Sequence, residues 1–394
     1  MTLEGFQDFG PAQLALLARL RRDAGTLFAD AGYVEVAPPI LEPAESYVER
    51  SGEDIRARTY VFDDPGGEEV CLRPELTIPV CRLALRAGYA AKKIARLHYW
   101  GSVFRYEPLR AGRYRQFHQV GAELIGPVPE KDGDIEIAAL AVELARRAGL
   151  EDLTLRIGDR GLERAVFDAF GFDEAAGFAL LAGDGGKAKP VNAEAARLSA
   201  AVKGLSRGDA VAVLEQFMAA AGIARLGDRS LDEIVERLIA RDRAPPPTEA
   251  RAALAACEEA EGEGVRALDG LARKLEKLGV DAKAVLERIA NRASALTKNG
   301  VAADARRLAA RPRRAFAYYT GFHFELWRAD KRDAALLGGG GRYDRLIEML
   351  EPGVKAPAIG FALSVEGLAA ASKDFAAPLA LFAAAPKPRG KMKG

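Results

Sequence analysis

The stretch that decides the fold is FRYEPLRAGRYRQFHQVGAE, residues 104–123. Two runs of strand-forming residues flank a basic segment that contains Pro108 and Gly112. This pattern predicts a β-hairpin with a long loop. Guanidinium groups are planar forks that suit phosphate or carboxylate oxygens. The loop is therefore a candidate anion-binding segment, and its arginines are Arg105, Arg110, Arg113 and Arg115.

The returning strand of this hairpin carries polar residues on one face. Side chains alternate between the two faces of a strand, so one face would hold Phe117, Gln119, Gly121 and Glu123. The opposite face would hold His118, Val120 and Ala122. Gly121 would leave space between the amide and the carboxylate. A solvated hairpin with a polar face would show the same alternation.

The stretch resembles motif 2 of the class II aminoacyl-tRNA synthetases, in the form found in histidyl-tRNA synthetase. The resemblance implies that Arg105 contacts the α-phosphate of ATP and that Glu107 and Arg113 belong to the same nucleotide site. It also implies that Gln119 and Glu123 bind the α-amino group of histidine. Such a resemblance names a superfamily and does not by itself name an activity.

Composition sets broad bounds on the class of protein. The chain has 394 residues, of which 49% are hydrophobic and 29% charged, with a net charge of +1. This is ordinary for a soluble globular protein with a large core, in one elaborated domain or two. The near-zero charge gives no general sign of nucleic-acid binding.

Three cysteines, Cys71, Cys81 and Cys257, cannot all pair and show no metal-ligand spacing, which favours a reducing compartment. The N-terminus lacks the pattern of a secretory leader, and no apolar run reaches the roughly 18 residues of a membrane span. We therefore expect a cytoplasmic protein with no membrane contact, no metal and no cofactor.

Residues 12–31 have the apolar spacing of an amphipathic helix, with Leu14 and Leu17 on its apolar stripe. A strand is predicted over 33–41, where Pro38 and Pro39 place it at an edge or an interface. This order resembles motif 1 of the class II family and implies a homodimer through residues 12–41. A surface helix followed by an edge strand would also fit.

The segment RPELTIPVCR, residues 73–82, resembles the R-P-E-G-T motif of histidyl-tRNA synthetases. The resemblance implies that Glu75 and Thr77 accept hydrogen bonds from the ammonium group of the amino acid, a role that suits a carboxylate and a hydroxyl. Leu76 replaces the usual glycine, and Pro79 is added. That form resembles the regulatory subunit of ATP phosphoribosyltransferase, a relative of the synthetase.

Residues from about 160 to 310 predict a helical insertion without recognisable chemistry. The insertion is rich in alanine, arginine, leucine and glutamate, and prolines 245–247 interrupt it. Apolar spacing predicts helices over 212–221, 231–240, 249–259, 265–278 and 282–298. Before the insertion, a buried helix is predicted over 135–148 and a strand over 153–157.

The segment RRAFAYYTGFHFELW, residues 313–327, resembles the R-G-L-D-Y-Y motif of histidyl-tRNA synthetases. The resemblance implies that Arg314 assists adenylate formation and that Tyr318 and Tyr319 line the histidine side-chain pocket. Ala317 stands where the motif has an aspartate. The following GGGGRYDRL, residues 338–346, lacks the lysine of a phosphate loop. It would instead be a strand and loop beside the amino-acid pocket.

The segment AIGFALSVEGL, residues 358–368, resembles motif 3, a strand followed by a helix that ends in G-x-E-R-L. Gly367 stands where the motif has the arginine that binds the γ-phosphate of ATP. Loss of a comparable arginine costs on the order of 10³ in rate or more. The residues after Leu368 are too few for an anticodon-binding domain of roughly 100 residues. We therefore expect no aminoacylation.

The sequence predicts an α+β fold of the class II synthetase type: an antiparallel sheet flanked by helices over residues 1–372, with the insertion at about 160–310. Residues 373–394 would form a flexible tail. No anticodon-binding domain is expected.

The resemblance implies a regulatory subunit of ATP phosphoribosyltransferase. Such a subunit is not itself catalytic, assembles with the short catalytic subunit into a hetero-octamer, and mediates feedback inhibition by histidine in the first step of histidine biosynthesis. Histidine would be its ligand, and tRNA is not an expected partner. The nucleotide residues would be vestigial: Arg105, Glu107, Arg113 and Arg314. The alternatives are a truncated histidyl-tRNA synthetase and an orphan paralogue that forms an aminoacyl-adenylate.

Overall fold

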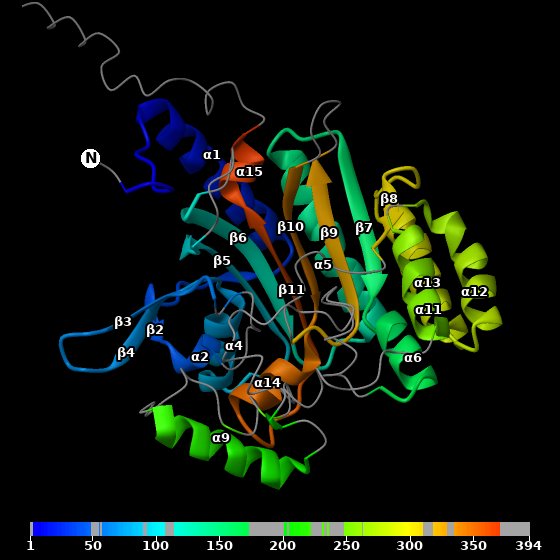
Figure 1. Cartoon of the computed structure of the whole chain (residues 1–394). Coiled ribbons are helices and arrows are strands. Elements are labelled where there is room, and N and C mark those ends of the chain that lie inside the picture. The colour runs from blue at the N-terminus through cyan, green and yellow to red at the C-terminus, as the bar shows by residue number, and fades with distance from the viewer. Residues whose placement is uncertain are drawn as a thin grey trace, which may run out of the picture. The chain divides into compact units, whose positions relative to one another are not determined.

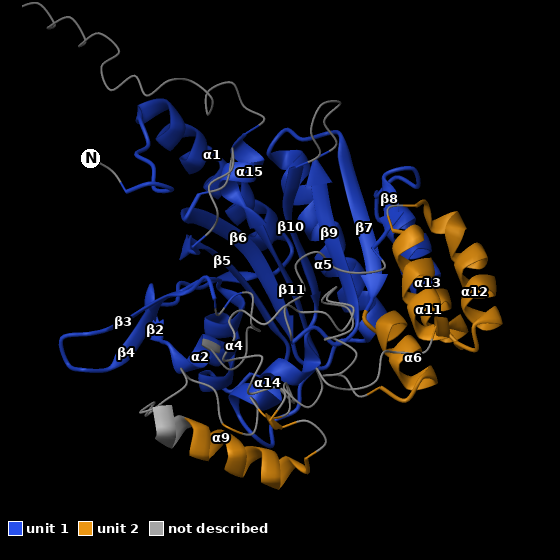
Figure 2. Cartoon of the chain, viewed as in Figure 1, with its two compact units in different colours: residues 1–159, 289–394 blue, residues 160–288 orange. Residues whose placement is uncertain are grey.

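The structure is a computed structural model. It describes residues 3–48, 55, 57–89, 93–106, 114–172, 201–202, 205–221, 231, 235, 248–261, 263–309, 318–328 and 335–370. The chain divides into two compact units (Figure 2): residues 1–159 with 289–394 form one, and residues 160–288 form the other.

The larger unit contains an eight-stranded sheet of order β1-β5-β6-β11-β10-β9-β7-β8 (Figure 1). Neighbouring strands are antiparallel except the pairs β1/β5 and β7/β8, which are parallel. In sheet order the strands are Val34–Glu35, Ala95–Phe104, Gln116–Ile125, Ala358–Ser364, Ala335–Arg342, Phe322–Arg328, Leu153–Asp159 and Arg306–Leu308. The α+β prediction with a mostly antiparallel sheet is confirmed.

The predicted hairpin is present as β5 and β6. Its register runs from Ala95 opposite Ile125 to Phe104 opposite Gln116. The alternation predicted for β6 follows from this register, because Gln119, Gly121 and Glu123 are two residues apart along one strand. The loop between the strands, residues 107–113, lies outside the described part of the chain.

One face of the sheet is covered by two long helices, α1 (Pro11–Asp30) and α5 (Glu130–Arg147). Phe28 of α1 packs on Phe361 of β11, with ring centroids 6.2 Å apart. The apolar stripe of α1 differs from the prediction at Leu14, which is exposed, because Leu16 and Leu20 turn toward the protein instead.

The opposite face packs against α4 (Thr77–Arg86) and α14 (Asp344–Leu350). A small antiparallel sheet of order β2-β4-β3 belongs to the same unit, with strands Leu41–Pro43, Glu69–Leu72 and Tyr60–Asp63. The short helix α2 (Glu45–Val48) follows β2. The prediction of one continuous strand over 33–41 is wrong, because the structure has two short strands, β1 and β2, with no strand between them. Pro38 and Pro39 lie in this interval and have no N–H to donate to a ladder.

The smaller unit is helical in its described residues. Its helices are α6 (Gly161–Ala169), α9 (Arg207–Ala221), α11 (Thr248–Glu259), the 3₁₀ turn η1 (Val265–Ala267) and α12 (Leu268–Lys277). The helix α13 (Lys283–Lys298) crosses from this unit into the larger one. Most of the helix predicted over 231–240 lies outside the described residues. No helix in the described ranges is long and apolar enough to cross a membrane.

Candidate functional site

A pocket opens on the face of the sheet opposite α1 and α5. It has about 640 Å³ of empty space, its open mouth included. Six residues predicted from sequence line it: Glu75, Thr77, Arg105, Gln119, Tyr318 and Tyr319. Glu123 adjoins the pocket and is fully buried. Glu107, Arg113, Arg314 and Ala317 lie outside the described residues, so their predicted places stay predictions.

The floor of the pocket is made by small residues on the two middle strands. Glu123 of β6 lies opposite Gly360 of β11, which lies opposite Gly341 of β10, and Gly341 lies opposite His323 of β9. A Cβ atom at Gly360 would collide with the Glu123 carboxylate. Glycine is therefore required at 360 by the carboxylate beside it, and the small residues leave room for a ligand between β6 and β9.

The Glu123 carboxyl group is surrounded by three hydroxyl groups. Thr77 Oγ1 donates to Glu123 Oε1 at 2.8 Å, and Tyr99 Oη donates to the same oxygen at 2.9 Å. Tyr343 Oη donates to Oε2. Burial raises the pKa of Glu123 to about 8, although these hydrogen bonds act to lower it. A cation placed in the pocket would favour the ionised form.

Glu75 lies two residues before Thr77, the first residue of the helix α4. Its Oε2 accepts the backbone N–H of Thr77 at 2.6 Å, and its Oε1 accepts that of Ile78 at 3.0 Å. Burial raises the pKa of Glu75, while the two backbone hydrogen bonds lower it. Each carboxylate oxygen can accept a second hydrogen bond. Glu75 therefore caps the helix and still offers acceptors at the edge of the pocket.

Gln119 brings a buried acceptor to the pocket wall. Its side chain is 6% exposed, and within the described ranges its Oε1 atom has no hydrogen-bond partner. Leaving such an atom unpaired costs about 1–3 kcal/mol. A ligand N–H would remove that cost. Beside it, Arg105 donates from Nε to the Pro74 carbonyl at 2.7 Å.

Three tyrosines form an aromatic wall. The ring centroid of Tyr318 lies 5.5 Å from that of Tyr319 and 5.8 Å from that of Tyr343, both in edge-to-face contact. The sequence predicted Tyr318 and Tyr319 but missed Tyr343, which lies two residues after the glycine run that marked this segment. It also missed Tyr99, which lies opposite Gly121, and the pocket residues His323 and Glu325.

The motif 3 segment forms β11 and the short helix α15 (Val365–Ala369). Ser364 is the N-cap residue of α15, and its Oγ accepts the Gly367 N–H at 3.1 Å. Glu366 ties α15 to β6, since its carboxylate oxygens accept the His118 N–H at 3.0 and 2.9 Å. Gly367 thus belongs to a helix that is held against the hairpin, and it contributes no cation there.

This sheet, with its flanking helices and the pocket over its glycine strands, defines a protein of the class II aminoacyl-tRNA synthetase type. Solved structures show the same fold. One is an ATP phosphoribosyltransferase regulatory subunit/histidyl-tRNA synthetase from Bacillus halodurans, with a TM-score of 0.64, 22% identity, and 93% of this chain and 82% of that chain covered. Another is a histidine–tRNA ligase subunit from Alicyclobacillus acidocaldarius, with a TM-score of 0.63, 24% identity, and 93% and 96% covered.

The chain belongs to the histidyl-tRNA synthetase family, whose model matches residues 5–368. It is 30% identical over 366 residues to a histidine–tRNA ligase of Pyrococcus horikoshii, covering 93% of this chain and 74% of that relative. It is 32% identical over 356 residues to an ATP phosphoribosyltransferase regulatory subunit of Brucella anthropi, covering 86% and 93%. The resemblance to histidyl-tRNA synthetases is confirmed as family membership, and these identities do not separate a ligase from a regulatory subunit.

The buried carboxyl group of Glu123 should make stability depend on pH. Its pKa of about 8 in the folded state exceeds its ordinary value, so between about pH 4 and 8 the folded protein keeps a proton that the unfolded chain loses. In that window Glu123 lowers the free energy of unfolding by up to about 1.4 kcal/mol per pH unit as pH rises. Glu123→Gln should remove this dependence.

Urea unfolding of the wild-type protein and of Glu123→Gln at several pH values checks this. The gain in stability from the substitution should grow toward pH 8 and then level off. Parallel pH curves for the two proteins would contradict the assignment. Glu143→Gln, a change at an exposed carboxylate on α5, is the control and should leave the curve unchanged.

Proposed function

We propose that this chain is a non-catalytic, histidine-binding regulatory subunit of ATP phosphoribosyltransferase. The observation that carries the proposal is Gly367. In the resembled motif 3 an arginine at this position binds the γ-phosphate of ATP, and here the position on α15 has no side chain. Phosphoryl-transfer chemistry depends on such positioned cations, whose loss costs on the order of 10³ in rate.

The pocket supports binding of an amino acid. Acceptor groups suited to an ammonium group come from Glu75, Thr77 and Gln119, with Glu123 beside them. The aromatic wall of Tyr318, Tyr319 and Tyr343 would lie near an imidazole ring. Because the acceptors are buried, their interaction with an ammonium group is stronger than it would be in water.

One similar protein carries the name that the proposal gives to this chain. The Brucella anthropi relative is a regulatory subunit of ATP phosphoribosyltransferase, and the match covers 93% of its length. We infer that this chain, like the family it resembles, acts on a short catalytic subunit and transmits inhibition by histidine. The predicted nucleotide residues would then be vestigial.

The proposed assembly begins with a homodimer through residues 12–41. Four large apolar side chains in that segment are between 45% and 64% exposed: Leu14, Val34, Ile40 and Leu41. Burying this apolar surface in a dimer would contribute a free energy of about 25 cal/mol per Å² to association. The dimer would join the catalytic subunit in the hetero-octamer that the family resemblance implies.

One observation favours a second candidate. Arg105 is buried and lines the pocket, as an α-phosphate contact would require. An active histidyl-tRNA synthetase, or a paralogue that forms an aminoacyl-adenylate, would use this arginine. Arg105 also donates to the Pro74 carbonyl and lies over the Phe117 ring at 5.5 Å, so its position has a structural cause as well.

Histidine should bind to the purified chain, and the buried carboxylates should carry much of the affinity. Glu75→Gln and Glu123→Gln should each weaken binding by on the order of 2 kcal/mol, roughly thirtyfold, because the ligand ammonium loses a buried ionic partner. Calorimetry at pH 8 measures this, with Glu143→Gln as the exposed control. Equal affinity in the wild-type protein and both variants would exclude this pocket as the histidine site.

The partner claim is tested by co-expression with a short ATP phosphoribosyltransferase catalytic subunit. The two chains should co-elute, phosphoribosyltransferase activity should require this chain, and histidine should inhibit the complex. Glu75→Gln should weaken inhibition without preventing assembly. Sedimentation of this chain alone should give at least a dimer. Separate elution with no change in activity would contradict the regulatory role.

A further inference from the structure

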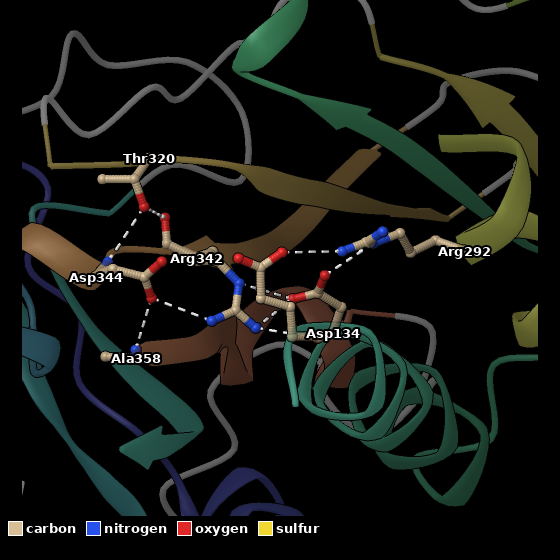
Figure 3. A network of polar contacts seen from close by, with 7 residues as sticks. Asp134, Arg292, Thr320, Arg342, Asp344 and Ala358 are labelled. Atoms are coloured by element: carbon tan, nitrogen blue, oxygen red, sulfur yellow. Dashed lines mark hydrogen bonds and ion pairs between the residues drawn. The ribbon is translucent and has the colours of Figure 1, made fainter. Parts of the chain in front are cut away.

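A buried ion-pair network lies on the side of the sheet that faces α5 (Figure 3). Asp134 of α5 is fully buried, and its carboxylate contacts two arginines. Arg342 Nη2 donates to Asp134 Oδ1 at 2.7 Å, and Arg292 Nε donates to Oδ2 at 2.9 Å. None of these three residues lines the pocket.

The network continues at both ends. Arg342 Nη1 lies 3.1 Å from Asp344 Oδ1, and Arg292 Nη2 lies 3.4 Å from Glu130 Oε2. Charges therefore alternate in sign along the five residues. A buried charge is stable only with partners of opposite sign. Arg292, Asp134 and Arg342 each have an oppositely charged neighbour on both sides. The arrangement favours one relative position of the elements that carry these residues.

The two segments that hold the pocket tyrosines both contact this network. Tyr343 lies between Arg342 and Asp344 in the sequence, and its hydroxyl reaches Glu123. Thr320 directly follows Tyr319. Its N–H donates to the Arg342 carbonyl at 2.8 Å, and its Oγ1 accepts the Asp344 N–H at 3.2 Å. The network thus fixes both segments that form the aromatic wall.

The other end of the network lies on α13. Arg292 is in the part of this helix that belongs to the larger unit, which resumes at Ile289. The helical unit ends at Arg288, so α13 is the segment by which the chain returns from it. A shift of α13 would act directly on the Asp134 carboxylate.

We propose that Asp134 is a positioning residue for the pocket: through Arg342 it holds the aromatic wall in place, and through Arg292 it makes histidine affinity depend on the position of α13. The inference rests on the proposed function in using histidine as its ligand. Any event that moves α13 would then change histidine affinity, since coupling of this kind is carried by residues in contact.

The test compares Arg292→Met, Arg292→Lys and Arg96→Met in the full chain. Arg292→Met leaves Asp134 paired with Arg342, so folding should persist. Arg96 pairs with Glu136 on the same helix α5 at 2.9 Å and provides the control. We expect Arg292→Met to weaken L-histidine binding by about threefold to thirtyfold. Arg292→Lys should restore part of the loss, and Arg96→Met should stay within about twofold of wild type.

A double-mutant cycle with Tyr343→Phe separates positioning from general stability. If Arg292 acts through the aromatic wall, Arg292→Met should weaken binding less in the Tyr343→Phe background than in the wild-type background. Urea unfolding gives the stability of each variant. A loss of stability without loss of affinity, or fully additive losses of affinity, would overturn the proposal.

Failure of the proposed function has a different outcome. If the wild-type chain does not bind L-histidine, the proposed function is wrong. The positioning role is then tested by the pH dependence of the free energy of unfolding. Because Tyr343 donates to Glu123, Arg292→Met should then shift the pH range over which Glu123 lowers the free energy of unfolding. An unchanged window would overturn the positioning role as well.

Discussion

A buried carboxyl group, that of Glu123, is the constraint on which the rest of the pocket depends. A buried polar group is costly unless hydrogen bonds compensate it, and its ionised form costs more unless a cation is also present. Three hydroxyls do so in part, and they come from α4, from β5 and from the residue before α14. Gly360 on the neighbouring strand leaves the space that the carboxylate fills. Glu123 therefore links these elements to one another around the pocket.

The pocket and the catalytic machinery can be considered separately. Binding an amino acid requires acceptors and an aromatic wall, whereas activating it requires groups that stabilise a transition state. The described residues bring acceptors and aromatic rings together in one pocket, and Gly367 on α15 has no side chain. A chain of this kind can keep ligand recognition and use it for regulation. Regulation further requires that histidine bind one assembly state more tightly than another.

The fold was predictable where local pattern determines it. The alternation of β6 placed Gln119 and Glu123 on one face, and the strand–helix order of motif 3 was readable from sequence. The partners of Glu123 were not, because Tyr99 and Tyr343 lie 24 and 220 residues away in sequence. Similarly, the Asp134 network joins side chains 158 and 208 residues apart. Leu14 was wrongly placed on the buried stripe of α1, because helical spacing alone cannot show which stripe meets the sheet.

The central claim, a pocket that binds histidine without activating it, is tested most directly by histidine-dependent exchange of pyrophosphate into ATP. The purified wild-type chain is assayed at a histidine concentration that calorimetry shows to be saturating, beside an active histidyl-tRNA synthetase. The account predicts exchange no faster with histidine than without it. Robust histidine-dependent exchange would contradict it and would identify the chain as an adenylate-forming enzyme.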